Sequence, residues 1–142
     1  MTTAPQGFEF SSDDDRMDRA RIHAWLSTEA YWALGRSRSV QDAAIDGSRN
    51  FGVFRTSGEQ VAYARVVTDG VTFGWVCDVF VDQAVRGVGV GRALVSGMTA
   101  ELDAMQLKRV LLKTGDAHGL YREFGFVDLE DPHPWMLRTP PG

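Results

Sequence analysis

The chain has 142 residues, of which 44% are hydrophobic and 24% charged, and these values suit a single globular domain over residues 1–142. Its formal net charge of −4 at pH 7 argues against nucleic acid as the main partner, because phosphate backbones are bound by basic surfaces. One cysteine excludes an internal disulfide. With no leader-like N-terminus and no apolar run of about 18 residues, we expect a cytoplasmic protein that does not enter a membrane.

The first half of the chain predicts two helices and an antiparallel meander. Two stretches have helical spacing of their apolar residues: residues 16–29, which N-cap residues precede, and residues 40–48. Val40, Ala43 and Ala44 are expected to form the buried face of the second helix. Four stretches bounded by turn residues are expected to be strands: residues 8–10, 51–56, 60–68 and 71–81.

The pattern changes in the second half. Apolar residues recur at helical spacing along a helix of about 14 residues: Val90, Leu94, Met98, Leu102 and Met105. A strand at residues 110–114 would then pair in parallel through a right-handed crossover. A short helix and two short strands complete the prediction: residues 117–124, 126–129 and 135–138. The predicted fold class is α/β with a mixed sheet, in which an antiparallel meander precedes a parallel β-α-β element and helices cover both faces.

A glycine-rich loop joins the meander to the long helix. Glycine occupies alternate positions at Gly87, Gly89 and Gly91, and Arg86 and Arg92 flank them. The first N–H groups of a helix have no internal partner and carry partial positive charge, and glycine lets them approach a phosphate closely. One glycine would serve a plain strand-to-helix turn. Three at alternating positions favour a loop that binds a pyrophosphate.

Two common phosphate-binding patterns do not fit this loop. The Rossmann fingerprint needs G-x-G-x-x-G at the start of a β-α-β unit, but Arg92 stands three positions after Gly89. A Walker-type loop needs Gly-Lys-Ser/Thr, and none follows. The loop therefore predicts a different phosphate-bearing ligand.

Two segments and the order of the elements resemble the GCN5-related N-acetyltransferase (GNAT) family. Arg86-x-x-Gly89-x-Gly91, placed after a strand, resembles the acyl-CoA signature of that family. Leu120–Phe126 resembles its second hallmark, roughly 30 residues further on and beyond the expected strand. The stretch from the end of the meander through this hallmark also resembles a small bacterial subgroup whose acceptors are mostly unassigned.

The resemblance implies where acetyl-CoA, the expected co-substrate, would bind. Backbone N–H groups of the glycine loop would hold its pyrophosphate: Gly87, Val88, Gly89, Val90, Gly91 and Arg92. Val79, Phe80 and Val81 would splay away from the next strand, so that the pantetheine arm bonds to open strand backbone as an added strand would. Arg86 and Arg92 would pair with phosphates.

Tyr121 is the candidate proton donor to the departing thiolate. The resemblance implies that Tyr121 faces the cofactor. A phenol with a pKa of about 10 can donate a proton to a thiolate whose conjugate acid has a pKa of ~8.5. A core tyrosine is the alternative, since Leu120, Phe124 and Phe126 around it are structural. A backbone N–H near Phe80 or Val81 would stabilise the carbonyl oxygen.

Two side chains are candidates for the base that deprotonates the amine. Asp78 stands in an otherwise apolar strand, where an unpaired buried charge is costly, so it is either partnered or functional. His118 precedes Tyr121 by three positions, on the same face of a short helix. Solvent or a water relay is the third alternative.

The resemblance implies an acceptor site lined by the first two helices, the loop between them and the last hairpin: Arg36, Arg38 and His133, with the aromatic residues Tyr31, Trp32, Trp75 and Trp135. Such rings can stack on another ring or on a cationic amine, whereas Arg36 or Arg38 can bind a carboxylate. Scattered surface residues are the alternative reading. No metal is expected, because the three histidines show no ligand spacing.

These observations predict an acyl-CoA-dependent N-acetyltransferase, a monomer or homodimer, that acts on a primary amine of a small molecule. Transfer would occur by direct attack in a ternary complex. A protein N-terminal or lysine acetyltransferase is one alternative. A non-catalytic acyl-CoA binding module is the other; it would keep the glycine loop and have no need of Tyr121.

Overall fold

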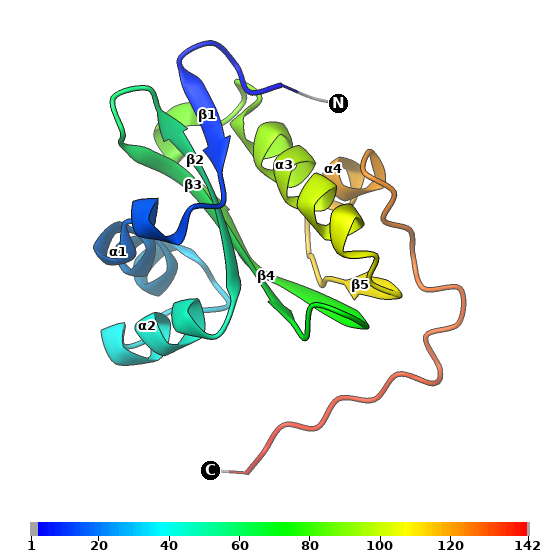
Figure 1. Ribbon diagram of the computed structural model, residues 1–142. Coiled ribbons are helices and arrows are strands. Elements are labelled where there is room, and N and C mark those ends of the chain that lie inside the picture. Colours follow the sequence, from blue (N-terminus) through cyan, green and yellow to red (C-terminus); the bar gives the residue numbers. More distant parts are fainter. Residues whose placement is uncertain (1–2, 142) are drawn as a thin grey trace.

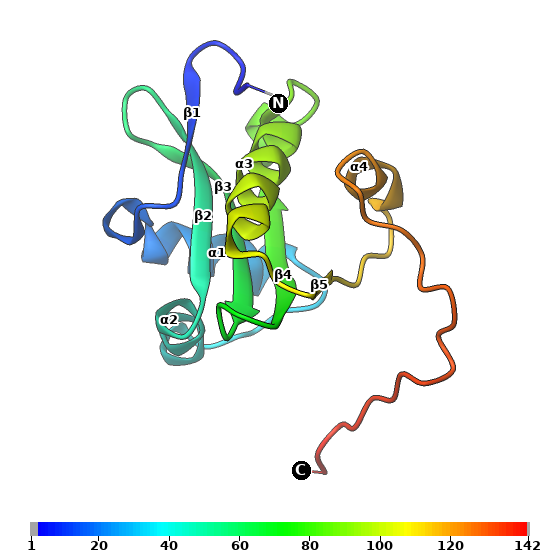
Figure 2. The same ribbon diagram turned by 45° about the vertical axis from the view of Figure 1, so that its right-hand side comes forward.

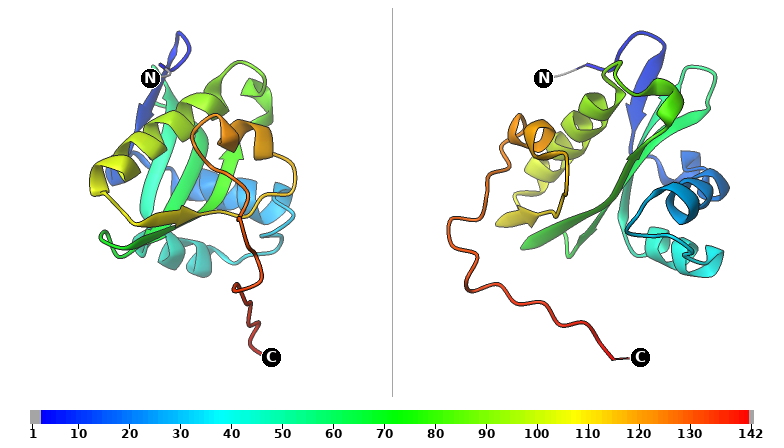
Figure 3. Two further views of the ribbon diagram at one scale, coloured as in Figure 1. Left: turned by 90° about the vertical axis from the view of Figure 1, so that its right-hand side faces the viewer. Right: turned by 180° about the vertical axis from the view of Figure 1, so that it is seen from behind.

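The structure, a computed structural model, describes residues 3–141 and is built on one five-stranded sheet in the order β1-β2-β3-β4-β5. Helices α1 and α2 cover one face, and α3 and α4 lie on the other (Figures 1 and 3). The strands are β1 (Phe8–Ser11), β2 (Arg49–Arg55), β3 (Gln60–Thr68), β4 (Phe73–Val81) and β5 (Arg109–Leu111). The helices are η1 (Asp14–Arg16), α1 (Arg19–Glu29), α2 (Arg38–Asp46), η2 (Gln83–Val85), α3 (Val90–Met105) and α4 (His118–Arg122).

The strand directions confirm the predicted fold class. Strands β1 to β4 pair antiparallel in sequence order, whereas β4 and β5 pair in parallel. The crossover between the parallel strands is α3, which lies across the sheet in Figure 2. The meander therefore comes first and the β-α-β element second, as predicted.

Each face of the sheet has its own apolar core. The stripe predicted for α3 packs against the sheet, with Val90, Leu94 and Met98 at most 1% exposed. On the opposite face, Ile22 and Leu26 of α1 are completely buried. Burial of these stripes stabilises the helices, because a short helix is marginal in water without tertiary packing.

The two N-terminal helices begin at residues other than those predicted, for reasons of capping. The side chain of Asp18 accepts a hydrogen bond from the Arg21 N–H, so α1 starts at Arg19, and residues 14–16 form the separate turn η1. The Ser37 side chain caps α2 in the same way, and this helix starts at Arg38.

The predicted buried face of α2 is wrong. Gln41 and Ile45 face the protein interior, whereas Val40 is 56% exposed. The Oε1 atom of buried Gln41 accepts a hydrogen bond from Arg36 at 3.0 Å, whereas its Nε2 group has no partner among the described residues. Gln41 is thus buried on the face of α2 where the apolar pattern predicted Val40.

The two C-terminal strands predicted at residues 126–129 and 135–138 are absent from the described part of the chain. Residues 126–141 leave the body of the protein after α4 in every view (Figures 1, 2 and 3). Strand β5 is also shorter than predicted, because it separates from β4 after Leu111. A strand needs a partner for its backbone groups, and these segments lie beside none.

No helix within residues 3–141 is both long enough and apolar enough to cross a membrane.

We predict that Gly97→Ala destabilises the fold. A Cβ at this position of α3 would lie 2.5 Å from the Phe10 ring of β1, so the helix or the strand must shift. Overpacking of this kind costs about 1–3 kcal/mol, measurable by urea unfolding. Gly119→Ala is the matched control, because no atom lies within 4 Å of its Cβ and alanine favours a helix. Equal stability of the two variants would contradict the packing of β1 against α3.

Candidate functional site

A cleft of about 820 Å³ opens between β4 and the segment that follows β5. Its walls come from the loop after α1, from β4 and the glycine loop, from residues 112–117 and from α4. The residues singled out in the sequence that line it are Tyr31, Trp32, Arg36, Trp75, Asp78, Val79, Phe80, Val81, Arg86, Gly87, Gly91 and Tyr121. Residues that are far apart in the sequence thus meet at one site.

A bulge in β4 opens the cleft. Two β4 residues, Asp78 and Val79, stand opposite the single residue Ala64 of β3. Asp78 takes a φ of 54°, in the left-handed region that aspartate enters more readily than most residues with a Cβ. Such a bulge bends its strand, and β4 pairs with β5 only at Phe73–Trp75. On the β5 side, the backbone of residues 79–81 therefore borders the cleft instead of a neighbouring strand.

The glycine loop leads into α3 through left-handed backbone positions and leaves the start of the helix without a side-chain cap. Gly87 and Gly89 have φ values of 82° and 97°, which residues with a Cβ rarely adopt. Gly89 is the N-cap of α3, and no side chain caps the helix. The first N–H groups of this 16-residue helix consequently have no intrahelical acceptor, and the helix dipole adds partial positive charge there.

The two arginines that flank the loop differ in their partners. Arg86 lines the cleft, and its Nε donates to the Val81 carbonyl at 2.9 Å. Arg92 points elsewhere and forms a bidentate ion pair with Glu123, at 2.8 and 2.9 Å. Arg92 and three loop residues expected to touch the cofactor, Val88, Gly89 and Val90, do not line the cleft.

Tyr121 brings a buried phenol to the cleft. Its side chain is 6% exposed and packs edge-on against Phe126, with the ring centroids 5.8 Å apart. Burial, with a smaller contribution from the charge of Asp116, raises the pKa of Tyr121 to about 12. The phenol therefore keeps its proton at neutral pH and acts there as a hydrogen-bond donor.

Asp78 is partnered on both of its oxygens. Its Oδ1 accepts from Trp32 Nε1 at 2.9 Å, and its Oδ2 accepts from Arg36 Nη1 at 2.7 Å and from Arg65 Nε at 2.6 Å. Burial acts to raise the pKa of Asp78, but the hydrogen bonds from the two arginines outweigh it and lower that pKa. A carboxylate held in this way is a weak proton acceptor.

His118, the second candidate base, lies apart from Asp78. It is exposed at the start of α4 and lines a separate cavity of about 970 Å³ beneath the C-terminal segment. Tyr121 borders both cavities. In the part of the chain from residue 3 to residue 141, no three His, Cys, Asp or Glu side chains come together to hold a metal ion.

Three aromatic side chains line the same cleft as Asp78, and one of them, Trp32, donates a hydrogen bond to it. Tyr31 packs edge-on against Trp32, with ring centroids 5.0 Å apart and an interplanar angle of 87°. Trp75 of β4 completes the set. Arg65 was missed in the sequence, although a lone basic residue in a buried strand, next to a strand with a lone acidic residue, is a signal for such a pair.

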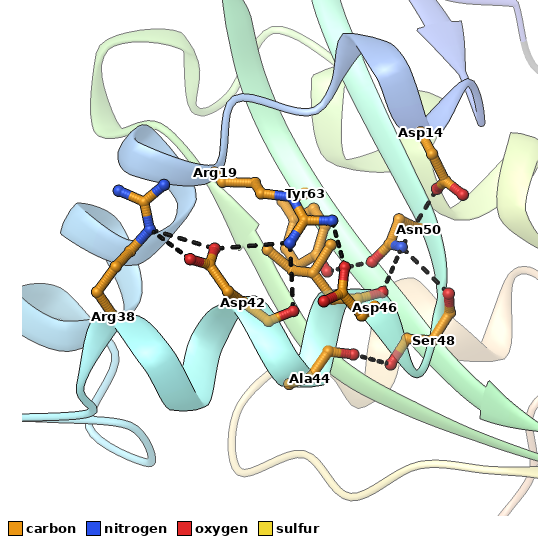
Figure 4. A network of polar contacts seen from close by, with 10 residues as sticks. Asp14, Arg19, Arg38, Asp42, Ala44, Asp46, Ser48, Asn50 and Tyr63 are labelled. Atoms are coloured by element: carbon orange, nitrogen blue, oxygen red, sulfur yellow. Dashed lines mark hydrogen bonds and ion pairs between the residues drawn. The ribbon is translucent and has the colours of Figure 1, made fainter.

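The loop that carries Tyr31, Trp32 and Arg36 is held at both ends by the helix pair α1–α2. Arg19 of α1 binds Asp46 of α2 at 2.6 Å and lies 3.6 Å from Asp42, which also pairs with Arg38 (Figure 4). The helix pair is joined to the sheet through Asn50 of β2, whose amide donates to the Ile45 and Ser48 carbonyls and accepts from Tyr63. The loop is thus fixed between two anchored helices.

Comparison with known proteins places these features in a wider group. A family model described as "Acetyltransferase (GNAT) family" matches residues 17–126. A crystal structure from Xanthomonas campestris pv. campestris, described as a "putative acetyltransferase belonging to the gnat family", is 38% identical to this chain. It covers 99% of this chain and 97% of its own, with a TM-score of 0.88.

Two further proteins are similar in sequence. A "Putative acetyltransferase" from Gibberella zeae is 29% identical over 143 aligned positions, which cover 85% of this chain and 80% of that protein. "Serotonin N-acetyltransferase 2, chloroplastic" from Oryza sativa subsp. japonica is 35% identical over 73 residues. That match covers 51% of this chain and 36% of the rice protein.

We predict that Asp78→Ala destabilises the protein by about 3–5 kcal/mol, because it leaves two half-buried guanidinium groups without their carboxylate. Asp42→Ala is the control: its carboxylate pairs with arginines at the surface, where such pairs contribute about 0–1 kcal/mol. Urea unfolding measures both. A loss below about 1 kcal/mol for Asp78→Ala would contradict the role of this network.

The change of stability at acid pH gives a second test of the ion pairs of Asp78. Because the folded pKa of Asp78 is lowered, its contribution is complete above the unfolded value of about 3.9 and is lost as pH falls through the folded pKa. Asp78→Asn keeps the shape of the side chain and removes the titration. The stability difference between the natural protein and Asp78→Asn should therefore shrink below about pH 4. A difference that does not change with pH would count against the ion pairs.

Proposed function

The chain belongs to the GNAT acetyltransferase family, and on that premise we propose that it transfers an acetyl group from acetyl-CoA to a primary amine of a small molecule, by direct attack in a ternary complex. The observation that carries the proposal is a single cleft in which the glycine loop, the open backbone of β4 and the Tyr121 phenol meet. The rice relative supports a small-molecule acceptor, since serotonin, which its name contains, is a small aromatic amine.

The residues of the cleft fit acetyl-CoA, which supplies the acetyl group as a thioester. The glycine loop and the start of α3 offer backbone N–H groups to a pyrophosphate, and Arg86 adds a positive charge beside them. No protein atom lies within 4 Å of the place where a Cβ of Gly87 would stand, so the space before the loop is open. The backbone of residues 79–81 offers hydrogen-bonding groups to an amide-bearing arm.

Tyr121 is proposed as the proton donor to the departing sulfur. The amine nitrogen forms its bond to the carbonyl carbon, the carbon–sulfur bond breaks, and the thiolate takes a proton from the phenol. The pKa of Tyr121 is about 12 and that of the thiol is ~8.5, so the phenolate form of Tyr121 takes up a proton readily once the thiol has formed. The second proton lost by the amine therefore returns to Tyr121, which is protonated again at the end of the reaction.

Solvent is proposed as the acceptor of the first proton, the one that turns the ammonium form of the substrate into a free amine. Asp78 has both oxygens occupied by donors and a lowered pKa. His118 lines the other cavity. Of the three alternatives drawn from the sequence, water is the one that the geometry of the cleft favours, and Asp78 is proposed as a positioning residue.

We predict that Tyr121→Phe lowers kcat by at least ~100-fold, the loss typical of a removed general acid, while the Kd for CoA stays within ~3-fold. Thiol release from acetyl-CoA is measured across a panel of amines and peptides, and CoA binding by calorimetry. Unchanged turnover would remove Tyr121 from the mechanism. Tight CoA binding by the natural protein without turnover on any amine or peptide would instead favour a non-catalytic acyl-CoA binding module.

We predict that Gly87→Ala weakens CoA binding by at least ~10-fold, because a Cβ strains the left-handed backbone and occupies the space before the loop. Gly58→Ala is the matched control. Gly58 has a φ of 104° and open space around it, but it lies in the β2–β3 turn, away from the cleft. Both variants should lose similar stability, and only Gly87→Ala should lose affinity in calorimetry. An equal CoA affinity of the two variants would refute the proposed pyrophosphate site.

A further inference from the structure

The end of the cleft around Asp78 carries more positive than negative charge. Arg36 and Arg65 both donate to Oδ2 of Asp78, and all three residues line the cleft. One carboxylate offsets one of the two guanidinium charges. The arginine side chains are only 18% and 14% exposed, so water screens the second charge incompletely.

Other charged residues of the cleft do not cancel this surplus. Glu29 lies at the exposed end of α1, where its Oε1 accepts a hydrogen bond from Gln83 at 2.7 Å. Asp116 is exposed in the loop before α4, and within residues 3–141 neither carboxylate forms an ion pair with Arg36 or Arg65. Lys113, also on the cleft, adds a further positive charge.

Arg36 has hydrogen-bond donors that the protein does not use. Its Nη1 group donates to Asp78 and to Oε1 of Gln41. Its Nε and Nη2 groups have no acceptor among residues 3–141, and neither is a buried atom without a partner. A guanidinium fixed along one edge in this way presents its remaining N–H groups, in one plane, to a second carboxylate.

Flat apolar surfaces stand beside this guanidinium. The indole N–H of Trp32 is fixed on Asp78, and the ring remains 45% exposed. Tyr31 holds that ring edge-on, and Trp75 is 36% exposed on the same cleft. Large aromatic side chains left open in a cleft favour a ligand with an aromatic group of its own.

From these contacts we infer that the acceptor is an amine that also carries a carboxylate and an aromatic ring, in chemical terms an aromatic amino acid. Its carboxylate pairs with the free edge of Arg36, and its ring lies against Trp32 and Trp75. A carboxylate has a single negative charge, which matches the single uncompensated guanidinium of the Asp78 cluster. This inference rests on the proposed function, because it names the substrate class of the same site.

Matched pairs of amines test the inference. L-5-Hydroxytryptophan and serotonin differ only in the α-carboxylate, as do L-tryptophan and tryptamine. We expect kcat/KM for thiol release to be at least ~10-fold higher for the carboxylated member of each pair, chiefly through a lower KM. Equal or better use of serotonin and tryptamine would overturn the inference and leave the proposed function standing. No turnover with any amine, despite CoA binding, would overturn both.

Variants of Arg36 and Arg38 test whether Arg36 is the residue that causes the preference for carboxylated amines. Arg36→Gln should reduce the ratio within each pair towards one, and Arg36→Lys, which keeps the charge and the pairing with Asp78, should restore part of it. Arg38→Gln is the matched control, because Arg38 pairs with Asp42 on the surface of α2 and does not line the cleft. Calorimetric CoA binding reports whether each variant is folded. A full preference retained by folded Arg36→Gln, or none in folded Arg36→Lys, would refute the assignment to Arg36.

Discussion

A carboxylate buried at a bulge is the constraint on which the cleft depends. The Asp78 side chain is 2% exposed, and a charge so placed is tolerated only with partners. Its three partners come from two places in the chain: Trp32 and Arg36 from the loop after α1, and Arg65 from β3. One side chain thus joins the loop that carries the aromatic residues to the strand that opens the cleft. The left-handed backbone at Asp78 is held in place by the same contacts.

The two ends of the cleft present different kinds of groups to a ligand. On the side of the glycine loop, the lining groups include Gly87, Gly91 and the edge of β4 at residues 79–81, which β5 leaves unpaired. On the side of Asp78, they are aromatic rings and guanidinium groups. Backbone groups bind chemical features that many ligands share. Side chains that line a cleft can be substituted without disturbing the sheet, so they can differ from one ligand specificity to another. We infer that the donor half of the reaction is set by the fold and the acceptor half by a few residues.

Local patterns explain which parts could be predicted from the sequence. The α3 stripe and the position of the glycine loop before α3 are properties of residues close together in the chain, and the structure has the helix and the loop where the sequence placed them. The pairing of Asp78 with Arg65 depends on the register of β3 against β4 and on a bulge, which no local pattern contains. The buried face of α2 was misjudged because Gln41 found a partner in Arg36. The prediction of the two last strands was wrong because an alternating pattern shows only that a segment is able to pair. Whether a partner edge is available depends on the rest of the fold.

The separation of β4 from β5 places a strand edge inside the protein. Unpaired strand edges are templates on which other chains add and aggregate, and proteins usually cover, charge or shorten them. Here the unpaired part of β4 lies within a cleft closed on its other sides by the glycine loop, by residues 112–117 and by α4. An edge that borders a cleft is less exposed to a second sheet than an edge at the rim of the molecule. The place of this edge thus works against edge-to-edge pairing of chains, while its backbone groups still line the cleft.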